Sequence, residues 1–425
     1  MRTCLNNPCY RVALAVAAVA MFSGGDWLQF RGTDSNSATE HELPPSIGDT
    51  DNVRWKVELP GKGPASPVVV GNRVIVTGSS GVDQGRLHVQ CFDASSGKKM
   101  WHRQFWATGS GLTHPLTANA APTPACDGQR IFALFSSNDL ICLDLDGNLQ
   151  WLRGLTYDFP SARNDVGLAS SPLAVGSVVV VQIENQAKSF AAGIDAKTGQ
   201  TRWSLDRNRG ANWASPMVLR GTDGNDQVIL QSPNALTAHE PDTGKVLWKY
   251  EKDCAGICSA APAAGVVYVP SGGVTALRPQ AGSEPEVLWS SGALQPGSAS
   301  LVAGPDKVYA INGGGVLASA DIKTGKVLWR LRLEGTYWGT PVVARSRLYA
   351  INQDGTAVVV DVSGPRGKRI GKGSFGETIL CSPAVAEGAM FVRSDRHLWK
   401  LGGPPKPIEP AANAGLGGSQ LAEQH

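Results

Sequence analysis

The nine residues Asp321-Ile-Lys-Thr-Gly-Lys-Val-Leu-Trp329 decide the fold, because near-copies of them recur along the chain. Each clear copy has an acidic residue four positions before a glycine and a tryptophan four positions after it; the others run from Asp93 to Trp101, Asp195 to Trp203 and Glu240 to Trp248. Glycine suits the left-handed corner of a tight turn, and the acidic side chain can accept N–H bonds across it. The copies therefore predict a repeated strand–turn–strand unit and a repeat architecture.

Weaker versions of the unit lie between the clear ones. The copy from Asp144 to Trp151 has a shorter turn, the copy from Arg278 to Trp289 a longer one, and the turn that begins at Asp361 has no tryptophan. A flat indole on an outer strand can pack over the turn of the next unit. We therefore expect a structural docking role for seven tryptophans: Trp55, Trp101, Trp151, Trp203, Trp248, Trp289 and Trp329.

A second marker, a small residue that steps into an apolar strand, follows each tryptophan. It occurs at Ser66-Pro67, Ala121-Pro122, Ser171-Pro172, Ser215-Pro216, Ala261-Pro262, Ser300-Leu301, Thr340-Pro341 and Ser382-Pro383. The steps average about 45 residues, which is the size of a propeller blade with four short strands. We expect the first strand of each blade to follow the step and to line the crowded axis.

The strand count predicts how the ring closes. The last unit ends near Trp399 with three strands, and its fourth strand is missing. An orphan strand lies at Val53 to Leu59, before the first unit. Pairing the two would complete the last blade and remove exposed sheet edges. We therefore predict an all-β, eight-bladed β-propeller of four-stranded antiparallel blades, closed by an N-terminal strand that completes the last blade.

Composition agrees with many short strands and narrows the function classes. Gly 50 and Pro 27 in 425 residues favour turns over long helices. The formal net charge is +3, and no basic block of the kind that binds nucleic acid occurs. The six cysteines after the first thirty residues are too few for a disulfide scaffold, and the close pair Cys254 and Cys258 can be either bridged or free.

The N-terminus has the features of an export signal. Arg2 and Arg11 precede an apolar run from Val12 to Phe22, which is too short to span a membrane but has the length of a secretory h-region. We predict a signal peptide at residues 1–24, with an uncleaved anchor as the alternative, and export to the periplasm or cell envelope of a bacterium. Residues 25–52 are expected to form an extended N-terminal segment, 53–401 the propeller and 402–425 a disordered tail. We expect a monomer without a transmembrane span after signal removal.

The repeated turns resemble the tryptophan-docking motif of propellers of the pyrroloquinoline-quinone (PQQ) type, over residues 53–401. The segment from Trp27 to Gly32 is similar to the entry box of exported bacterial propellers of this class. That family includes quinoprotein alcohol dehydrogenases and, nearest in size, the propeller lipoprotein of the outer-membrane barrel-assembly machinery. The resemblance implies the fold but no single function, because the family holds enzymes and scaffolds alike.

Two connections between blades, from Trp101 to Pro122 and from Trp151 to Pro172, are longer than the others. They join neighbouring blades, so we expect them to lie side by side on one face. Aromatic and charged residues on protruding loops are common anchors of protein interfaces. A partner-binding surface is therefore predicted at Trp106, His114, Tyr157, Phe159, Arg163 and Asp165, with loop decoration that binds nothing as the alternative.

A second candidate site lies at the mouth of the axial channel. Glu184 and Asn185 offer oxygens that suit Ca²⁺, and ordinary turn chemistry is the alternative for both. Trp213 and Trp338 each precede a step proline by three residues. Either indole can stack on a planar ligand or fill space between blades.

Three functions are compatible with the sequence. The expected one is an exported, non-catalytic scaffold that binds an envelope protein or peptide and needs no cofactor, although the lipidation cysteine of the barrel-assembly lipoprotein is missing. The second is a PQQ/Ca²⁺-dependent quinoprotein dehydrogenase, for which the resemblance implies a Ca²⁺ cradle, a catalytic aspartate and often two adjacent cysteines. Adjacent cysteines occur nowhere in the chain, and no catalytic residue is assigned. The third is a propeller that senses a small ligand or saccharide.

Overall fold

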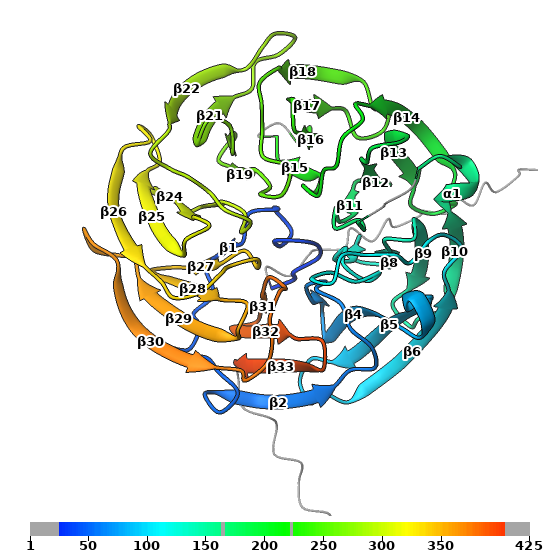
Figure 1. Ribbon diagram of the computed structural model, residues 1–425, viewed down its shortest axis with the longest axis horizontal. Coiled ribbons are helices and arrows are strands. Elements are labelled where there is room, and N and C mark those ends of the chain that lie inside the picture. The colour runs from blue at the N-terminus through cyan, green and yellow to red at the C-terminus, as the bar shows by residue number, and fades with distance from the viewer. Residues whose placement is uncertain (1–24, 163–165, 222–223, 404–425) are drawn as a thin grey trace, which may run out of the picture.

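The computed structural model describes residues 25–162, 166–221 and 224–403, which form a ring of eight β-sheets around one axis (Figure 1). Each sheet is a blade of four antiparallel strands, and one blade carries the short strand β1 (Ala38–Thr39) as a fifth. The described helical turns are η1 (Val82–Gln84) and α1 (Leu155–Asp158). The prediction of an all-β, eight-bladed propeller is confirmed.

The first four blades follow one another along the chain. Their strands are, for blade 1, β3 (Val68–Val70), β4 (Arg73–Ser80), β5 (Arg86–Asp93) and β6 (Lys99–Trp106); for blade 2, β7 (Ala125–Cys126), β8 (Arg130–Leu134), β9 (Asp139–Asp144) and β10 (Leu149–Gly154); for blade 3, β11 (Leu173–Val175), β12 (Val178–Ile183), β13 (Ser189–Asp195) and β14 (Thr201–Arg207); and for blade 4, β15 (Met217–Leu219), β16 (Gln227–Ser232), β17 (Ala235–His239) and β18 (Val246–Tyr250).

The remaining blades complete the circle. Their strands are, for blade 5, β19 (Ala261–Ala263), β20 (Val266–Val269), β21 (Val274–Arg278) and β22 (Glu286–Ser291); for blade 6, β23 (Val302–Ala303), β24 (Lys307–Ile311), β25 (Val316–Asp321) and β26 (Val327–Arg332); for blade 7, β27 (Val342–Ala344), β28 (Arg347–Ile351), β29 (Thr356–Asp361) and β30 (Lys368–Ser374); and for blade 8, β31 (Ala384–Ala386), β32 (Ala389–Arg393), β33 (His397–Gly402) and β2 (Val53–Glu58).

Blade 8 is built from both ends of the described chain. Strand β2 pairs antiparallel with β33, with Trp55 opposite Lys400 and Lys56 opposite Trp399. In Figure 1 the blue strand β2 lies at the rim, directly outside the red β33. The predicted closure by the orphan strand is confirmed.

Burial explains why the strands of one blade differ in sequence. Strand β12 is buried along its whole length because its two faces pack on neighbouring blades, whereas the outer strand β14 alternates between covered and exposed residues. The cores are shared between blades: Val89 and Cys91 of blade 1 pack with Ile131 and Ile141 of blade 2. Continuous apolar runs therefore mark inner strands, and alternating patterns mark outer ones.

The tryptophans of the repeat lie at the seams between blades. Six rings lie so close to a glycine of the next blade that an added Cβ would come within 2.8 Å of the indole; the pairs are Trp55–Gly97, Trp101–Gly147, Trp151–Gly199, Trp203–Gly244, Trp289–Gly325 and Trp329–Gly367. The first five indoles also donate their N–H to a backbone carbonyl of that next turn, at 2.8–3.1 Å. Glycine is needed at these turns because no other residue leaves room for the ring.

Trp248 departs from this arrangement. Its indole N–H donates to Gln227 Oε1 of its own blade at 2.8 Å. The corresponding glycine of the next turn, Gly282, has no neighbour within 4 Å of an added Cβ. The turn before Trp289 is the longest of the repeats, so the seam between blades 4 and 5 lacks the ring-on-glycine contact.

The segment before β1 enters the axial channel, where Figure 1 shows it in blue at the centre of the ring. In six blades it bonds the residue that lies three positions after the small residue at the start of the first strand: Trp27 with Val69, Leu28 with Cys126, Gln29 with Ala174, Ser35 with Val218, Asn36 with Ala303 and Ser37 with Val343. We call residues 26–37 the axial plug. It satisfies backbone groups that the crowded inner strands cannot pair with one another.

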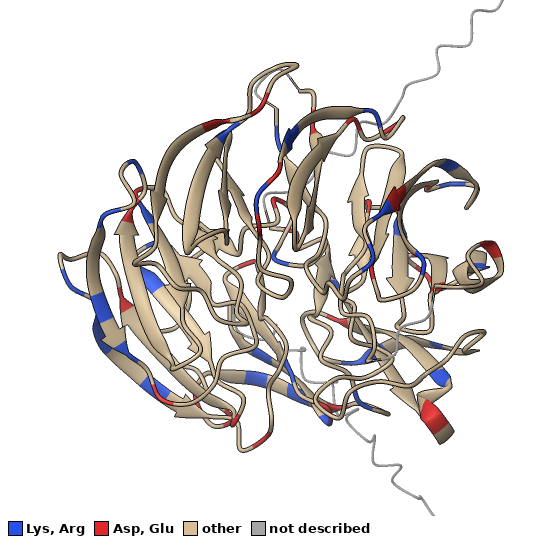
Figure 2. Ribbon diagram, turned by 45° about the horizontal axis from the view of Figure 1, so that its top comes forward, with Lys and Arg blue, Asp and Glu red and all other residues tan. Residues whose placement is uncertain are grey.

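Charged residues lie mainly on the outer strands and turns (Figure 2). The outer strands β26 and β30 contain Lys or Arg but no Asp or Glu except at their flanking turns, whereas both signs occur on other outer strands such as β14. The six cysteines of the described chain, Cys254 and Cys258 among them, are buried free thiols. Within the same residues, no helix is long and apolar enough to cross a membrane.

Candidate functional site

A cavity of about 380 Å³ lies on the axis, on the face where the connections between blades meet. We call it the axial cup. Its lining residues are Phe30, Pro64, Ser66, His114, Leu116, Thr117, Ala121, Thr123, Val166, Ala169, Ser171, Trp213, Ser215, Ile257, Ser259, Ser298, Ser300, Trp338, Thr340, Leu380 and Ser382. The cup is thus a largely apolar bowl with a band of hydroxyl groups.

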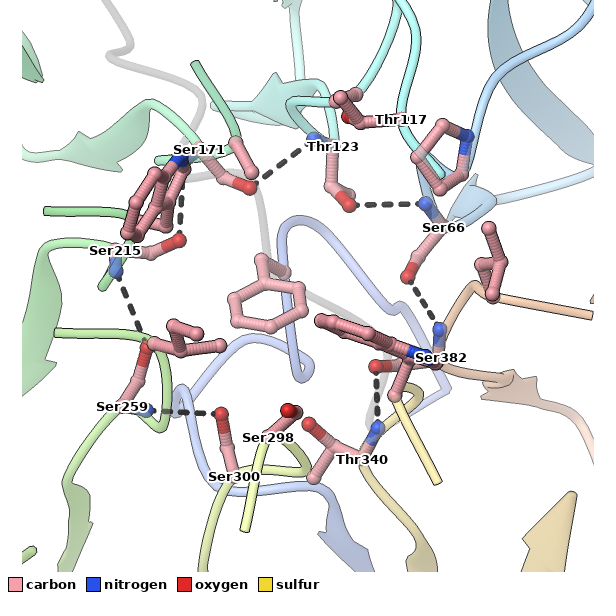
Figure 3. Close-up of a pocket in the computed structure, with 18 of the residues that line it drawn as sticks. Ser66, Thr117, Thr123, Ser171, Ser215, Ser259, Ser298, Ser300, Thr340 and Ser382 are labelled. Atoms are coloured by element: carbon pink, nitrogen blue, oxygen red, sulfur yellow. Dashed lines mark hydrogen bonds between the residues drawn. The ribbon is translucent and has the colours of Figure 1, made fainter. Parts of the chain in front are cut away.

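The band is a ring of hydroxyls, one from the start of each blade (Figure 3). In seven of the eight steps around the ring, a backbone N–H donates to the hydroxyl oxygen of the adjacent blade at 2.8–3.1 Å. The order is Ser66, Thr123, Ser171, Ser215, Ser259, Ser300, Thr340 and Ser382, and the last step returns to Ser66. The hydroxyl ring therefore joins the inner strands into a circle.

The step from Ser300 to Thr340 is the exception. Within the described ring no bond joins these two blades, so Thr340 Oγ1 accepts nothing from its neighbour, although the Thr340 N–H donates to Ser382 Oγ at 2.8 Å. Thr340 is 1% exposed and lines the cup. Its hydroxyl oxygen faces the cup, and no hydrogen bond joins it to a described protein group.

The ring corrects two of the sequence-predicted steps. In blade 2 the step is Thr123-Pro124, not Ala121-Pro122, and in blade 5 it is Ser259-Ala260, not Ala261-Pro262. The shift is two residues in each case. Its cause is the hydroxyl, which must stand two residues before the first strand residue to reach the N–H of the neighbouring blade.

Trp213 and Trp338 both lie in the wall of the cup. The Trp213 N–H donates to Gly167 O at 3.0 Å, and the Trp338 N–H donates to Gln353 Oε1 at 2.8 Å. Because both indole N–H groups are used by the protein, the rings offer the cup their apolar surfaces. Either ring is available for contact with a ligand.

Glu184 and Asn185 do not line the cup. The Glu184 carboxylate is buried and pairs with Arg207 Nε at 2.8 Å, and it accepts further bonds from Asn212 at 3.0 Å and Ser232 at 2.7 Å. Asn185 accepts the Ala187 N–H at 2.8 Å in its own loop. Since Asn212 precedes Trp213, this network holds the cup wall in place from behind.

The two long connections meet, as predicted from their neighbouring blades. The His114 N–H donates to Val166 O at 3.0 Å, and both residues line the cup. Gln84 holds the first connection by donating to Thr113 Oγ1 at 3.0 Å and accepting the Asn119 N–H at 2.9 Å. We call residues 105–116, 155–162 and 166–168 together the loop sector.

Asp139 fixes the base of the loop sector. Its carboxylate accepts the Thr108 N–H at 3.0 Å, the Thr108 hydroxyl at 2.6 Å and the Ser137 hydroxyl at 2.6 Å. Burial raises the pKa of Asp139 above its usual range, while these hydrogen bonds act in the opposite direction. The loops are thus anchored by buried polar contacts, which favours a preformed surface.

The structure distributes the predicted loop residues over the sector. Trp106 is 70% exposed and lies beneath Arg86, whose guanidinium carbon is 5.3 Å from the ring centroid, and Tyr157 is 76% exposed on α1. Phe159 stacks on Phe190 at 3.7 Å between centroids, so it packs inward. Arg163 and Asp165 lie outside the described residues.

Sequence reasoning missed an apolar margin around the cup. Val82 is 89% exposed and Leu112 is 63% exposed, and Leu116, Val166 and Ile257 are also exposed large apolar residues. The last three line the cup, and Leu112 belongs to the loop sector. Large aliphatic residues within turn segments rich in Gly, Ser and Thr were the signal that could have revealed this margin.

The residues of the cup do not fit a PQQ–Ca²⁺ pair. The described lining has no Asp, Glu, Asn or Gln to supply Ca²⁺ ligands and no Lys or Arg to pair directly with the carboxylates of the quinone. Glu184, the one buried carboxylate proposed for Ca²⁺, is occupied by Arg207. Among the described residues, no group of three or more His, Cys, Asp or Glu side chains is arranged to hold a metal ion.

Several solved structures share this fold. BamB from Moraxella catarrhalis is 16% identical, with a TM-score of 0.60 over 82% of this chain and 96% of that one. A europium-containing methanol dehydrogenase is 14% identical, with a TM-score of 0.64 over 87% and 90% of the two chains. Quinohemoprotein alcohol dehydrogenase from Comamonas testosteroni is 13% identical, with a TM-score of 0.64 over 91% and 82%. At these identities the likeness concerns the fold and not the activity.

No curated protein matches the sequence. The PQQ_2 family, described as outer membrane protein assembly factor BamB, matches residues 47–166, 161–255 and 270–370. These matches cover most of the chain and include the tryptophan turns that suggested a propeller of the PQQ type. The chain therefore belongs to the PQQ_2 family of BamB-like propellers.

Proposed function

We propose that this propeller is a non-catalytic scaffold of the bacterial cell envelope and that it binds a partner protein through the loop sector. The observation that carries the proposal is the pairing of anchored loops with exposed aromatic and aliphatic side chains. Trp106, Leu112 and Tyr157 are more than half exposed. The loop of Trp106 and Leu112 is held by Gln84 and Asp139, and the helical turn of Tyr157 begins with a bond from the Leu155 N–H to Asn138 O at 2.9 Å. Rigid loops with apolar anchors bind partners at low entropic cost.

The placement in the envelope rests on the family and on the N-terminus. The family description names an outer membrane assembly factor, and the first 24 residues have the composition of a signal peptide, although they lie outside the described residues. The dehydrogenase alternative has only the shared fold in its support, because the cup does not offer ligands for its cofactor.

The test uses site-specific photo-crosslinking in the host cells. Benzoylphenylalanine at Leu112 or Tyr157 should give the same adduct of defined mass, whereas the control position Leu328, which is 44% exposed on β26 of blade 6, should give none. Substitution is preferred to loop deletion, since the loops also carry the buried residues Leu155 and Leu168.

A second variant checks that the adduct reports binding. Trp106→Ala should reduce the Tyr157 adduct about tenfold, because an exposed tryptophan anchor typically contributes 1–2 kcal/mol or more to an interface. The melting temperature should stay unchanged, because Trp106 is mostly solvent-exposed. The proposal would be contradicted if the Leu328 position gave the same adduct in equal yield. It would also be contradicted if Trp106→Ala left the yield of the Tyr157 adduct unchanged.

A further inference from the structure

We infer that the axial cup binds a monocarboxylate carried on an apolar body, with the carboxylate on the hydroxyl ring and the body against Trp213 and Trp338. This inference goes beyond the proposed function, because it concerns a small ligand on the axis and not the partner on the loop sector. The argument has three parts: the donors of the ring, the charges behind it, and the apolar wall.

The ring offers hydrogen-bond donors. Seven of its oxygens already accept a backbone N–H from the adjacent blade, at 2.8–3.1 Å. Within the described chain none of these hydroxyls donates to a protein acceptor, so each keeps its own hydrogen for a ligand. Thr340, buried to 1% exposure, has an entirely unused hydroxyl in the same wall. A ligand that supplies acceptor atoms completes these groups.

Two buried arginines make the ring electropositive. Arg31 donates to Ala260 O at 2.6 Å and to Leu301 O at 2.7 Å, next to ring residues Ser259 and Ser300. Arg393 donates to Ala65 O at 3.3 Å, next to Ser66. Both guanidinium groups are buried. Arg31 has no described carboxylate among its electrostatic partners, whereas Asp395 acts on Arg393 without forming an ion pair with it.

Arg393 also polarises the ring through the backbone. The carbonyl of Ala65, which accepts from Arg393, belongs to the same peptide group as the Ser66 N–H, which donates to Thr123 Oγ1 at 2.9 Å. Hydrogen bonds in such a chain strengthen one another. The Thr123 hydroxyl is therefore a stronger hydrogen-bond donor than an isolated hydroxyl. This polarisation strengthens a bond to an anion more than a bond to a neutral acceptor.

The remaining wall defines the rest of the ligand. Trp213, Trp338, Ile257 and Leu380 present apolar surface, and no acidic residue of the described lining repels an anion. The volume of about 380 Å³ lies in the usual range for small-molecule sites. A polyol would place hydroxyl groups against this apolar wall without hydrogen-bond partners. A dicarboxylate would place its second negative charge against the same wall.

The probe is 2-naphthoate, and its uncharged isostere 2-acetylnaphthalene is the comparison. Calorimetric titration of the purified full chain should show 2-naphthoate binding at least about tenfold more tightly, because only the carboxylate responds to the arginine charges. EDTA should leave binding unchanged, since the cup has no Ca²⁺ ligands, and maltose should not compete. A tighter complex with 2-acetylnaphthalene, loss of binding in EDTA, or displacement by maltose would overturn the inference.

Matched variants locate the carboxylate. Thr340→Val keeps the shape of the side chain and should weaken 2-naphthoate about three- to tenfold, the equivalent of one lost hydrogen bond, whereas Thr340→Ser should restore it. Trp338→Ala should weaken both probes. The substitution Trp106→Ala lies outside the cup and should leave the affinity for both probes unchanged. The ligand inference and the partner proposal can therefore fail independently of each other. Equal affinity of 2-naphthoate for wild type and Thr340→Val would show that the carboxylate binds elsewhere.

Discussion

The two ends of the propeller axis use the same eight inner strands in opposite ways. At one end the axial plug bonds the strands through the residue three positions after each ring hydroxyl, in six of the eight blades. At the other end the hydroxyl ring accepts from the strands but donates to no described protein group. The first end is bonded to six of the inner strands by the chain itself, which stabilises the ring. The second end has hydroxyl donors that no described protein group uses, which suits it to binding.

Blades 5 and 8 lack the plug bond, and blade 5 has a covalent reason for it. In blade 5 the residue three positions after Ser259 is Pro262, which has no N–H to donate. Arg31 contacts this blade instead, through the carbonyl of Ala260 at 2.6 Å. Arg31 therefore bonds blade 5 at the position where Pro262 leaves the plug no N–H to bond.

The largest expected effect is at the plug. Asn36→Ala removes two bonds to Ala303, one donated to its carbonyl at 2.7 Å and one accepted from its N–H at 2.9 Å. Both groups of Ala303 would then be buried and unpaired, at a cost of about 2–4 kcal/mol in the free energy of unfolding. Urea denaturation followed by tryptophan fluorescence measures the change. A loss below about 0.5 kcal/mol would mean that the bonds of the plug do not stabilise the ring.

A smaller loss is expected within the ring. Ser382→Ala removes the acceptor of the Thr340 N–H, now bonded at 2.8 Å, and leaves that buried group unpaired. The free energy of unfolding should fall by about 1–2 kcal/mol. The same denaturation experiment tests this value, and an unchanged midpoint would show that the ring bonds contribute nothing to closure.

The plug should also show a pH signature of about 1 kcal/mol. Burial lowers the pKa of Arg31 to about 10, whereas the pKa of the guanidinium in the unfolded chain lies well above that value. Above pH 10 the unfolded state therefore binds more protons, so Arg31 adds stability as the pH rises. The free energy of unfolding of wild type, relative to Arg31→Met, should increase by about 1 kcal/mol between pH 8 and 10.5. A difference that falls over this range would contradict a buried, protonated Arg31.

The smallest change in the free energy of unfolding is expected for Thr340→Val, which distinguishes Thr340 from the other residues of the hydroxyl ring. Thr340→Val removes a hydroxyl that accepts from and donates to no described protein group, so the free energy of unfolding should change by less than about 0.5 kcal/mol. The comparison with Ser382→Ala is matched, because both residues belong to one ring. A loss as large as that of Ser382→Ala would show that Thr340 has a structural role and that its hydroxyl is not reserved for a ligand.

The fold was predictable because its signals repeat. The copies around Gly97 and Gly325 gave the blade, and the orphan strand at Trp55 gave the closure. The axial plug was not predictable, since residues 26–37 occur once and a lone Arg31 has the sequence character of a surface residue. The predicted step is two residues too early in blade 2 and two residues too late in blade 5, because the marker admits any small residue, alanine included, whereas the ring requires the hydroxyl of Thr123 or Ser259.

The candidate sites were predictable only in part. Two long connections in neighbouring blades were enough to bring their loops together, as the contact between His114 and Val166 shows. Sequence could not tell that Phe159 would turn inward onto Phe190, or that Arg207 would take the Glu184 carboxylate, because both depend on contacts between distant segments. The hydroxyl ring was visible as small residues, but its bonds appear only when eight blades meet.

The most direct test of the contrast between the two ends is a crystal structure of the protein soaked with 2-naphthoate. We predict the carboxylate within hydrogen-bond distance of Thr340 and its ring neighbours, the naphthalene against Trp338, and the axial plug in place beneath them. A naphthoate whose carboxylate points to solvent, or a channel from which Arg31 and Asn36 are absent, would contradict the account.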